Sequence, residues 1–420
     1  MFGGGRRDWS VDVLRCISCF MVCALHASWM TMPAIYGLVE PGSFDWVSGA
    51  AYRVIFGSPT VLFVMVSGIF FLSPERHVTA GKIWRKNVLK MTFAYIFWCL
   101  VYALYRIYFQ SPQPIDLTPQ ILITQWLHQE RHLWYIPMII GLYILVPILR
   151  PITASRDTKM FRYLIIIFAG GLVLNTIYTW PDFPYGENYI FKALEKTPME
   201  LMCQYLFWML FGWIAYTYRP CKKFRYFIYT VGIIMAVLGF CISLFNWEYA
   251  GDPDASTITR KFTIITFCKN TALFYFIVTV LREHEFSKVG KAILGKLSSC
   301  TLMIYLIHWL FLSIMMDHGF LYSSGMSPWI AVWIYAAIAY VCGGICGVIV
   351  QAVWKPFKKL FSGSSGKPRE TGKVPAAEKT PDAGKTLDTG KSSDTEKTLD
   401  IEKAPDAKPE SDRKETQETK

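Results

Sequence analysis

The sequence predicts an all-α integral membrane protein with about ten transmembrane helices, followed by a disordered C-terminal tail. Hydrophobic residues make up 53% of the 420 residues and charged residues only 18%, whereas a soluble domain carries about 25% charge. Apolar runs of about 17 or more residues, enough to cross a bilayer as a helix, recur along most of the chain. Because no water reaches the backbone in a bilayer, each run must satisfy its own hydrogen bonds, which predicts helices.

The apolar runs set the expected positions of the spans. We expect helices at about residues 11–32, 50–72, 88–109, 134–150, 161–179, 200–218, 226–246, 262–281, 298–316 and 328–352. The first run is long and lacks a small-residue cleavage site, so we expect it to remain as a helix. The fourth is short and contains Pro137 and Pro147, which favour a kink or a partly re-entrant path.

The basic residues of the loops gather on one side of the predicted bundle. They are Arg6 and Arg7 before the first helix and, after the even-numbered helices, Arg76, Lys82, Arg85, Lys86, Arg150, Arg156, Lys159, Arg219, Lys222, Lys223, Arg225, Arg282, Lys288, Lys291, Lys296, Lys355, Lys358 and Lys359. The intervening loops are acidic or neutral, apart from Arg260 and Lys261. By the positive-inside rule, the segment 1–10 and the C-terminus are cytoplasmic. The net charge of +12 therefore reflects topology and does not indicate a nucleic-acid partner.

The composition changes abruptly at about residue 361. Gly, Ser, Lys, Thr, Asp and Pro dominate from there, and a six-residue repeat reads GKTLDT, GKSSDT, EKTLDI and EKAPDA. Such a tract buries too little apolar surface to offset its chain entropy, so residues 361–420 are predicted to be a disordered cytoplasmic tail. The multi-spanning domain is expected to cover residues 11–355.

The first predicted helix contains three ionisable residues, and such residues inside a membrane are functional candidates. Arg15 and His26 are eleven positions apart, which returns to within about 20° of the same helix face with about 16.5 Å of rise. Asp12 precedes Arg15 by three residues and is close enough to pair with it. Alternatively, Arg15 extends to the membrane surface and His26 only hydrogen-bonds a neighbouring helix.

Two further histidines lie at helical positions within apolar sequence. His132 opens the fourth helix beside aromatic residues, and His308 lies about ten residues into the ninth. Either could be a structural histidine, at the interface or between helices. No histidines have the spacing of metal ligands, so no metal is expected. Most cysteines lie inside apolar runs, which indicates apolar packing and no disulfide framework.

Four segments together resemble the acyltransferase-3 family, multi-spanning bacterial O-acyltransferases that act on cell-surface glycans and lipid-linked sugars. They are the Arg15-x(10)-His26 pair, LFVMVSG at 62–68, HLWY at 132–135 with GLY at 141–143 and Pro147, and Ser298-Ser299 through YLIH at 305–308. The resemblance covers about residues 8 to 352 and is closest to members that acetylate surface polysaccharides. Many members carry R-x-x-R at the third helix, where this chain has the basic segment KIWRKNVLK at 82–90.

The resemblance implies transfer of an acetyl or other acyl group from cytoplasmic acyl-CoA to a hydroxyl of a glycan or lipid-linked sugar, in the bacterial cytoplasmic membrane. Acetyl-CoA would be the donor substrate, and no bound cofactor is expected. His26 would act as general base, because an unperturbed imidazole titrates near neutral pH. Arg15 would position the donor or stabilise oxyanion charge, with Asp12 on the same face. A covalent acyl-histidine is the alternative to direct transfer.

Six further residues are expected to contact the donor or acceptor. They are Arg85, Lys86, Lys90, His132, Trp134 and His308. The basic members of this set, together with Lys82, could attract the donor's phosphates, or they could serve only to fix topology.

The competing function is a transporter or exporter of a small polar solute or glycan precursor, because ten helices with a few buried charges also fit a proton-coupled carrier. The sequence has no evident inverted repeat, which argues against a carrier. A third possibility is a membrane component without activity, in which the histidines are structural.

Overall fold

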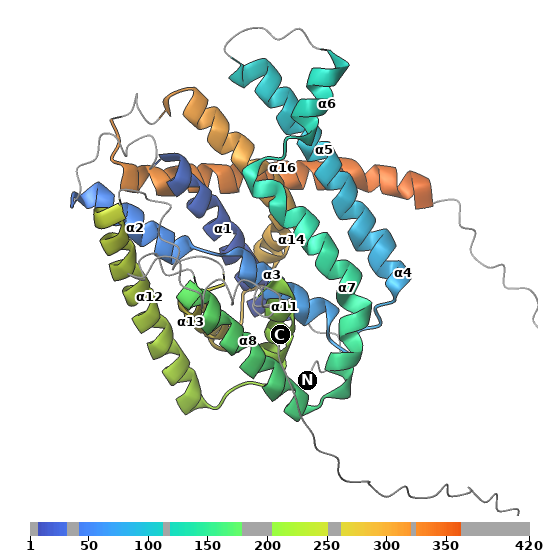
Figure 1. Ribbon diagram of the computed structural model, residues 1–420. Helices are drawn as coiled ribbons and strands as arrows, with labels where there is room; N and C mark the ends of the chain where they lie inside the picture. The colour runs from blue at the N-terminus through green and yellow to red at the C-terminus, as the bar shows by residue number, and fades with distance from the viewer. Residues whose placement is uncertain are drawn as a thin grey trace, which may run out of the picture. The chain divides into compact units, whose positions relative to one another are not determined.

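The computed structural model describes residues 7–31, 42–111, 118–178, 204–250, 262–320 and 325–362. All regular structure in these residues is helical (Figure 1). Most of the segment 1–10, and the predicted tail after residue 362, lie outside the described residues. The described residues therefore confirm the predicted all-α membrane fold.

The predicted spans all have helical counterparts. In the described part of the chain, eight stretches are long and apolar enough to cross a membrane: α1 (Trp9–Thr31), α2 with α3 (Phe44–Phe56 and Thr60–Phe71), α4 through η2 (Ala80–Gln110), η3 with α7 (Arg131–Trp134 and Tyr135–Ser155), α8 (Thr158–Tyr178), α12 (Lys222–Ala250), α14 (Lys288–Asp317) and α16 (Pro328–Ser362). Two shorter apolar helices, α11 (Tyr205–Thr217) and α13 (Ile264–Val280), match the sixth and eighth predicted helices. The short helix α6 (Pro119–Leu127) lies between the third and fourth spans.

The third span contains two π-helical turns. It runs from α4 (Ala80–Ile83) through the π-helical turn η1 (Trp84–Val88) into α5 (Leu89–Tyr105), and it ends in a second π-helical turn, η2 (Arg106–Gln110). Isolated π-helical turns are rare in proteins, and those that occur are often found at functional sites. The first of them contains Lys86 and Asn87.

The fourth span is longer than predicted. Helix α7 continues through Pro147 and Pro151 to Ser155, where Arg156 adopts a positive φ of 51°. Arg150 ties this end of α7 to the end of α3, because its guanidinium donates to the carbonyl oxygens of Phe71 and Ser73 at 2.8 and 3.1 Å. Pro147 and Pro151 thus lie within a continuous helix, and hydrogen bonds join its C-terminal turns to the end of α3.

The second span is broken where the sequence predicted one continuous helix. Ser58, between α2 and α3, has a positive φ of 60°, which interrupts the backbone hydrogen bonds. Lys269 of α13 donates from Nζ to the carbonyl oxygens of Val54 and Gly57, at 2.5 and 2.8 Å. Asn270 donates from Nδ2 to the Ser58 carbonyl oxygen at 3.3 Å. The side chains of α13 therefore satisfy carbonyls that the break exposes.

Two glycines bring α3 and α11 into backbone contact. A Cβ atom at Gly68 would lie 1.9 Å from the carbonyl oxygen of Met209, and one at Gly212 would lie 2.4 Å from the Cα of Met65. Close backbone approach through small residues is a common way of packing helices in membranes. This contact explains the glycine of the LFVMVSG segment and fixes the orientation of α3.

Gly68→Ala and Gly212→Ala are expected to destabilise the protein by about 1–3 kcal/mol each, because the added methyl group meets backbone atoms that cannot move aside. The measurement is the thermal unfolding of the purified, detergent-solubilised protein. Gly141→Ala and Gly170→Ala are matched controls on α7 and α8, since a Cβ there meets nothing within 4 Å. Equal unfolding temperatures for all four variants would contradict the proposed packing.

Candidate functional site

Three histidines from three separate elements meet inside the bundle. Nδ1 of His26, on α1, lies 2.7 Å from Nε2 of His308, on α14. The ring of His132, on η3, is centred 5.2 Å from that of His308 and 6.4 Å from that of His26. All three side chains are buried, with exposed fractions of 6% or less. The chain thus forms a histidine cluster from positions that are more than 100 residues apart.

The hydrogen bonds assign the tautomers of His26 and His308. Nδ1 of His308 lies 2.7 Å from the carbonyl oxygen of Tyr305 and 3.2 Å from that of Ile304. Carbonyl oxygens only accept, so this nitrogen carries the proton, and a neutral His308 has its lone pair on Nε2. Nδ1–H of His26 then donates to it, which leaves the lone pair of His26 on Nε2. His308 therefore holds His26 in the tautomer and orientation of a base.

His132 is enclosed by aromatic side chains. Its ring stacks on Trp309, with centroids 5.4 Å apart and an interplanar angle of 15°, and meets Tyr102 edge-on at 5.1 Å. Among the described residues, neither ring nitrogen has a hydrogen-bond partner. The backbone carbonyl of Leu306 lies near the ring but is not positioned to accept a hydrogen bond from it. This carbonyl oxygen instead accepts a hydrogen bond from the Tyr102 hydroxyl at 2.8 Å. A buried imidazole without partners is uncommon in native structures.

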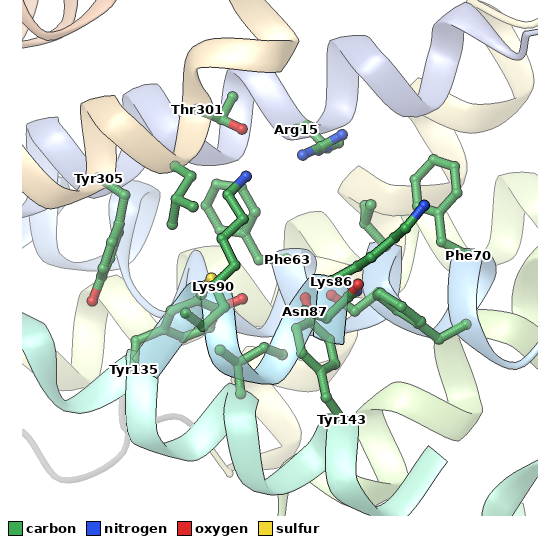
Figure 2. Close-up of a pocket in the computed structure, with 16 residues that line it drawn as sticks. Arg15, Phe63, Phe70, Lys86, Asn87, Lys90, Tyr135, Tyr143, Thr301 and Tyr305 are labelled. Atoms are coloured by element: carbon green, nitrogen blue, oxygen red, sulfur yellow. The ribbon is translucent and has the colours of Figure 1, made fainter. Parts of the chain in front are cut away.

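A cavity of about 390 Å³ lies next to the histidine cluster, and Tyr305 lines this cavity and contacts the rings of His132 and His308. Its polar lining includes Arg15 of α1, Lys86 and Asn87 of η1, and Lys90 of α5, and its aromatic lining includes Phe63, Phe70, Tyr135, Tyr143 and Tyr305. Figure 2 shows Arg15 on one side of the cavity and the two lysines on another. Lys86 and Lys90 are exposed and Arg15 is partly buried. The cavity therefore combines three cations with an apolar wall.

One helix connects the cavity with the histidine cluster. Thr301 and Tyr305 of α14 line the cavity with Arg15, and His308, one turn further on, bonds to His26. The Tyr305 ring contacts the rings of both His132 and His308, at centroid distances of 6.0 and 5.8 Å. Arg15 and His26 therefore face the same neighbouring helix, and Tyr305 of that helix contacts both the cavity and the cluster.

The predicted pair between Asp12 and Arg15 does not form. The Asp12 carboxylate instead accepts two hydrogen bonds from the Arg7 guanidinium, at 2.6 and 2.8 Å, and one from the Ser298 hydroxyl at 2.6 Å. The planar guanidinium of Arg7 suits such a two-point contact. Asp12 thereby fastens α1 to α14 and lies about 21 Å of helix rise from His26. Its position favours a structural role, and Arg15 remains directed to the cavity.

The remaining predicted site residues separate into two groups. Lys86 and Lys90 line the cavity, whereas Lys82 and Arg85, on the same segment, are exposed and do not. Trp134 packs against Tyr205, with centroids 5.8 Å apart, and is not part of the cavity lining.

Sequence reasoning assigned no role to several lining residues. Tyr135, Tyr143 and Tyr305 were visible only as parts of motifs, and Asn87 and Thr301 carried no signal. The position of Tyr305, three residues before His308 and so on the same helix face, is the one feature that could have indicated it.

Comparison with known proteins identifies one family. The model of a family described as an acyltransferase domain matches residues 8–349. The match extends from the start of α1 to α16 and includes both the histidine cluster and the cavity. No curated protein and no solved structure matches the chain.

Proposed function

Because this chain belongs to the acyltransferase-3 family of membrane acyltransferases, we propose that it transfers an acetyl group from acetyl-CoA to a hydroxyl of a cell-surface or lipid-linked glycan. The observation that carries this proposal is the cationic cavity, which one helix joins to the His26–His308 pair. The cavity would hold the donor, and the histidine pair would activate the acceptor.

The charges and shape of the cavity support binding of an acyl-CoA. Coenzyme A is anionic through its phosphates and carries its thioester on a long, flexible arm. The planar guanidinium of Arg15 suits phosphate oxygens in a two-point contact, and the ammonium groups of Lys86 and Lys90 act as point charges. The loop charges predict that this side of the bundle faces the cytoplasm of a bacterial cell, where acyl-CoA is found.

The separation between Arg15 and His26 assigns different tasks to them. Helix α1 rises about 16.5 Å between the two residues. Of the two roles predicted for Arg15, this distance favours positioning of the donor over contact with the reacting carbonyl. The thioester would extend past Tyr305 towards His26.

His26 would act as the general base. Nε2 of His26 takes the proton of the acceptor hydroxyl as its oxygen bonds to the thioester carbon. The carbon–sulfur bond then breaks, and the proton passes from His26 to the departing thiolate. His308 holds the base in place throughout through its hydrogen bond to Nδ1.

Lys86→Glu and Lys90→Glu are each expected to raise the KM for acetyl-CoA about tenfold, which corresponds to roughly 1.4 kcal/mol of lost donor binding. The physical reason is that each substitution places a negative charge beside the donor's phosphates. The assay follows release of CoA from radiolabelled acetyl-CoA by membranes that contain the full chain.

The matched controls are Lys82→Glu and Arg85→Glu, which make the same charge change on the same segment outside the cavity. Their KM should remain within about twofold of wild type, because exposed charges at a distance are screened by salt. A uniform rise in KM across all four variants would contradict donor binding in this cavity and would indicate a general effect of surface charge.

A further inference from the structure

Acyl transfer needs a hydrogen-bond donor that the roles of His26 and Arg15 leave unassigned. When the acceptor oxygen adds to the thioester, the carbonyl oxygen becomes an oxyanion. Stabilising it requires a donor held about 2.7–3.1 Å from that oxygen. Arg15 lies about 16.5 Å of helix rise from His26, which is beyond the reach of its side chain. The donor must therefore come from a residue beside the histidine cluster.

His132 has the required position. Its ring is centred 6.4 Å from that of His26, so a group that accepts a hydrogen bond from His132 would lie close to His26. Its exposed fraction is 1%, and neither ring nitrogen has a hydrogen-bond partner among the described residues. Leaving a buried donor without a partner is unfavourable, and a ligand that supplies an acceptor removes this cost.

The surroundings of His132 hold its ring in one place. Trp309 stacks on one face, Tyr102 meets the ring edge-on, and the hydroxyl of Tyr305 donates to the backbone carbonyl of His132. Within the described part of the chain, the side chains that contact the ring are aromatic rings and the other two imidazoles, and none of them is a carboxylate. Such a site suits a neutral imidazole, which has one N–H and can polarise a carbonyl group without carrying a charge itself. A fixed donor needs no reorganisation when the oxyanion forms.

We infer that the ring N–H of His132 donates to the carbonyl oxygen of the acyl group and stabilises the tetrahedral intermediate, an inference that rests on the proposed acyl transfer. The carbon–oxygen bond to the acceptor forms while the carbonyl π electrons move to the oxygen that His132 holds. When the carbonyl re-forms, the carbon–sulfur bond breaks and the thiolate leaves. The acceptor's proton travels through His26, and His132 keeps its own proton throughout.

The test compares His132→Leu, which removes the donor, with His132→Gln, whose side-chain amide can still donate. His132→Leu should lower kcat for acetyl-CoA consumption by about 10²–10³-fold and leave the KM for acetyl-CoA nearly unchanged. His132→Gln should recover part of the rate. His128→Leu is the matched control, because this exposed histidine lies four positions earlier and should behave as wild type.

A second measurement separates oxyanion binding from a structural role. A trifluoromethyl ketone analogue of acetyl-CoA forms a tetrahedral hydrate that resembles the intermediate. Across the wild type and both variants, the inhibition constant of the analogue should rise by the same factor by which kcat/KM falls, because both quantities report binding of the tetrahedral state. The affinity for CoA itself should stay constant. A misfolded variant would lose affinity for both compounds.

The outcomes distinguish this inference from the proposed function. Wild-type rates in His132→Leu, with His26→Ala inactive, would overturn the oxyanion role and leave acyl transfer intact. An analogue affinity that does not follow kcat/KM would also overturn it. If the wild type neither consumes acetyl-CoA nor binds the analogue, the proposed function and this inference both fail.

Discussion

His26→Ala is expected to lower the rate of acyl transfer by about 10²–10⁴-fold, the usual effect of removing a general base. The hydrogen bond to His308 directs the lone pair of His26 to Nε2, and alanine removes the only atom in the proposed mechanism that takes the acceptor's proton. The side chain is buried between apolar helices, and alanine keeps the helix apolar, so the protein should still insert. The measurement is acetyl-CoA consumption at equal levels of membrane-inserted protein.

Histidines outside the cluster supply the controls. His77→Ala and His284→Ala remove imidazoles from the loops and should leave the rate near that of wild type. Arg15→Lys keeps the charge in the cavity but loses the planar fork, so it should also reduce activity. Full activity of His26→Ala would exclude the general-base mechanism. If neither this variant nor the wild type consumed acyl-CoA with any acceptor, the transporter alternative would take precedence.

His308→Leu should reduce kcat on a similar scale, about 10²–10⁴-fold, with little change in the KM for acetyl-CoA. Loss of its Nε2 removes the acceptor that fixes the tautomer of His26, and the imidazole can then present Nε2 as a donor instead of a base. Loss of an orienting partner of a catalytic histidine has this order of effect in hydrolases. Steady-state kinetics with acetyl-CoA as the varied substrate provides the measurement.

The conservative variant His308→Gln distinguishes orientation from simple packing. The amide oxygen of glutamine can accept the Nδ1–H of His26, so this variant should recover much of the rate that leucine loses. The dependence of the rate on pH should also differ between the leucine variant and the wild type, because the partner of the titrating base has changed. Equal losses in the two variants, with unchanged pH profiles, would mean that His308 acts only through packing.

The spans and one helix face could be predicted from the sequence because both depend on local spacing. The apolar runs gave ten helices, and the period of the α-helix placed Arg15 and His26 on one face, which in the structure meets α14. Periodicity shows which residues share a face, but it does not show which faces meet. The bond between His26 and His308, across 282 positions, therefore had no local signal.

Charge patterns were ambiguous for a different reason. Lys82, Arg85, Lys86 and Lys90 all satisfy the positive-inside rule, and the rule does not depend on where each side chain points. Only the turn geometry of η1 and α5 places two of them in the cavity. For Asp12 the sequence offered Arg15 as a neighbour, but the competing partners were Arg7 at the helix start and Ser298 on another helix. A distant hydroxyl cannot be anticipated from helical spacing.

The contact between Lys269 and the broken second span has a consequence for biosynthesis. Helix α13 is only 17 residues long, and Lys269 is its sixth residue. A lysine at the centre of a membrane segment costs roughly 2.5–3.5 kcal/mol when the translocon transfers it into lipid, and a lysine in the first half of a short helix carries part of this cost. Its ammonium group finds carbonyls from a span that the ribosome completed about 200 residues earlier. We therefore expect α13 to insert poorly by itself and to depend on α2 and α3 for stable integration. A substitution that makes the helix continuous around Ser58 would remove these carbonyl acceptors. We expect it to reduce the membrane integration of α13 even where the catalytic residues are unchanged.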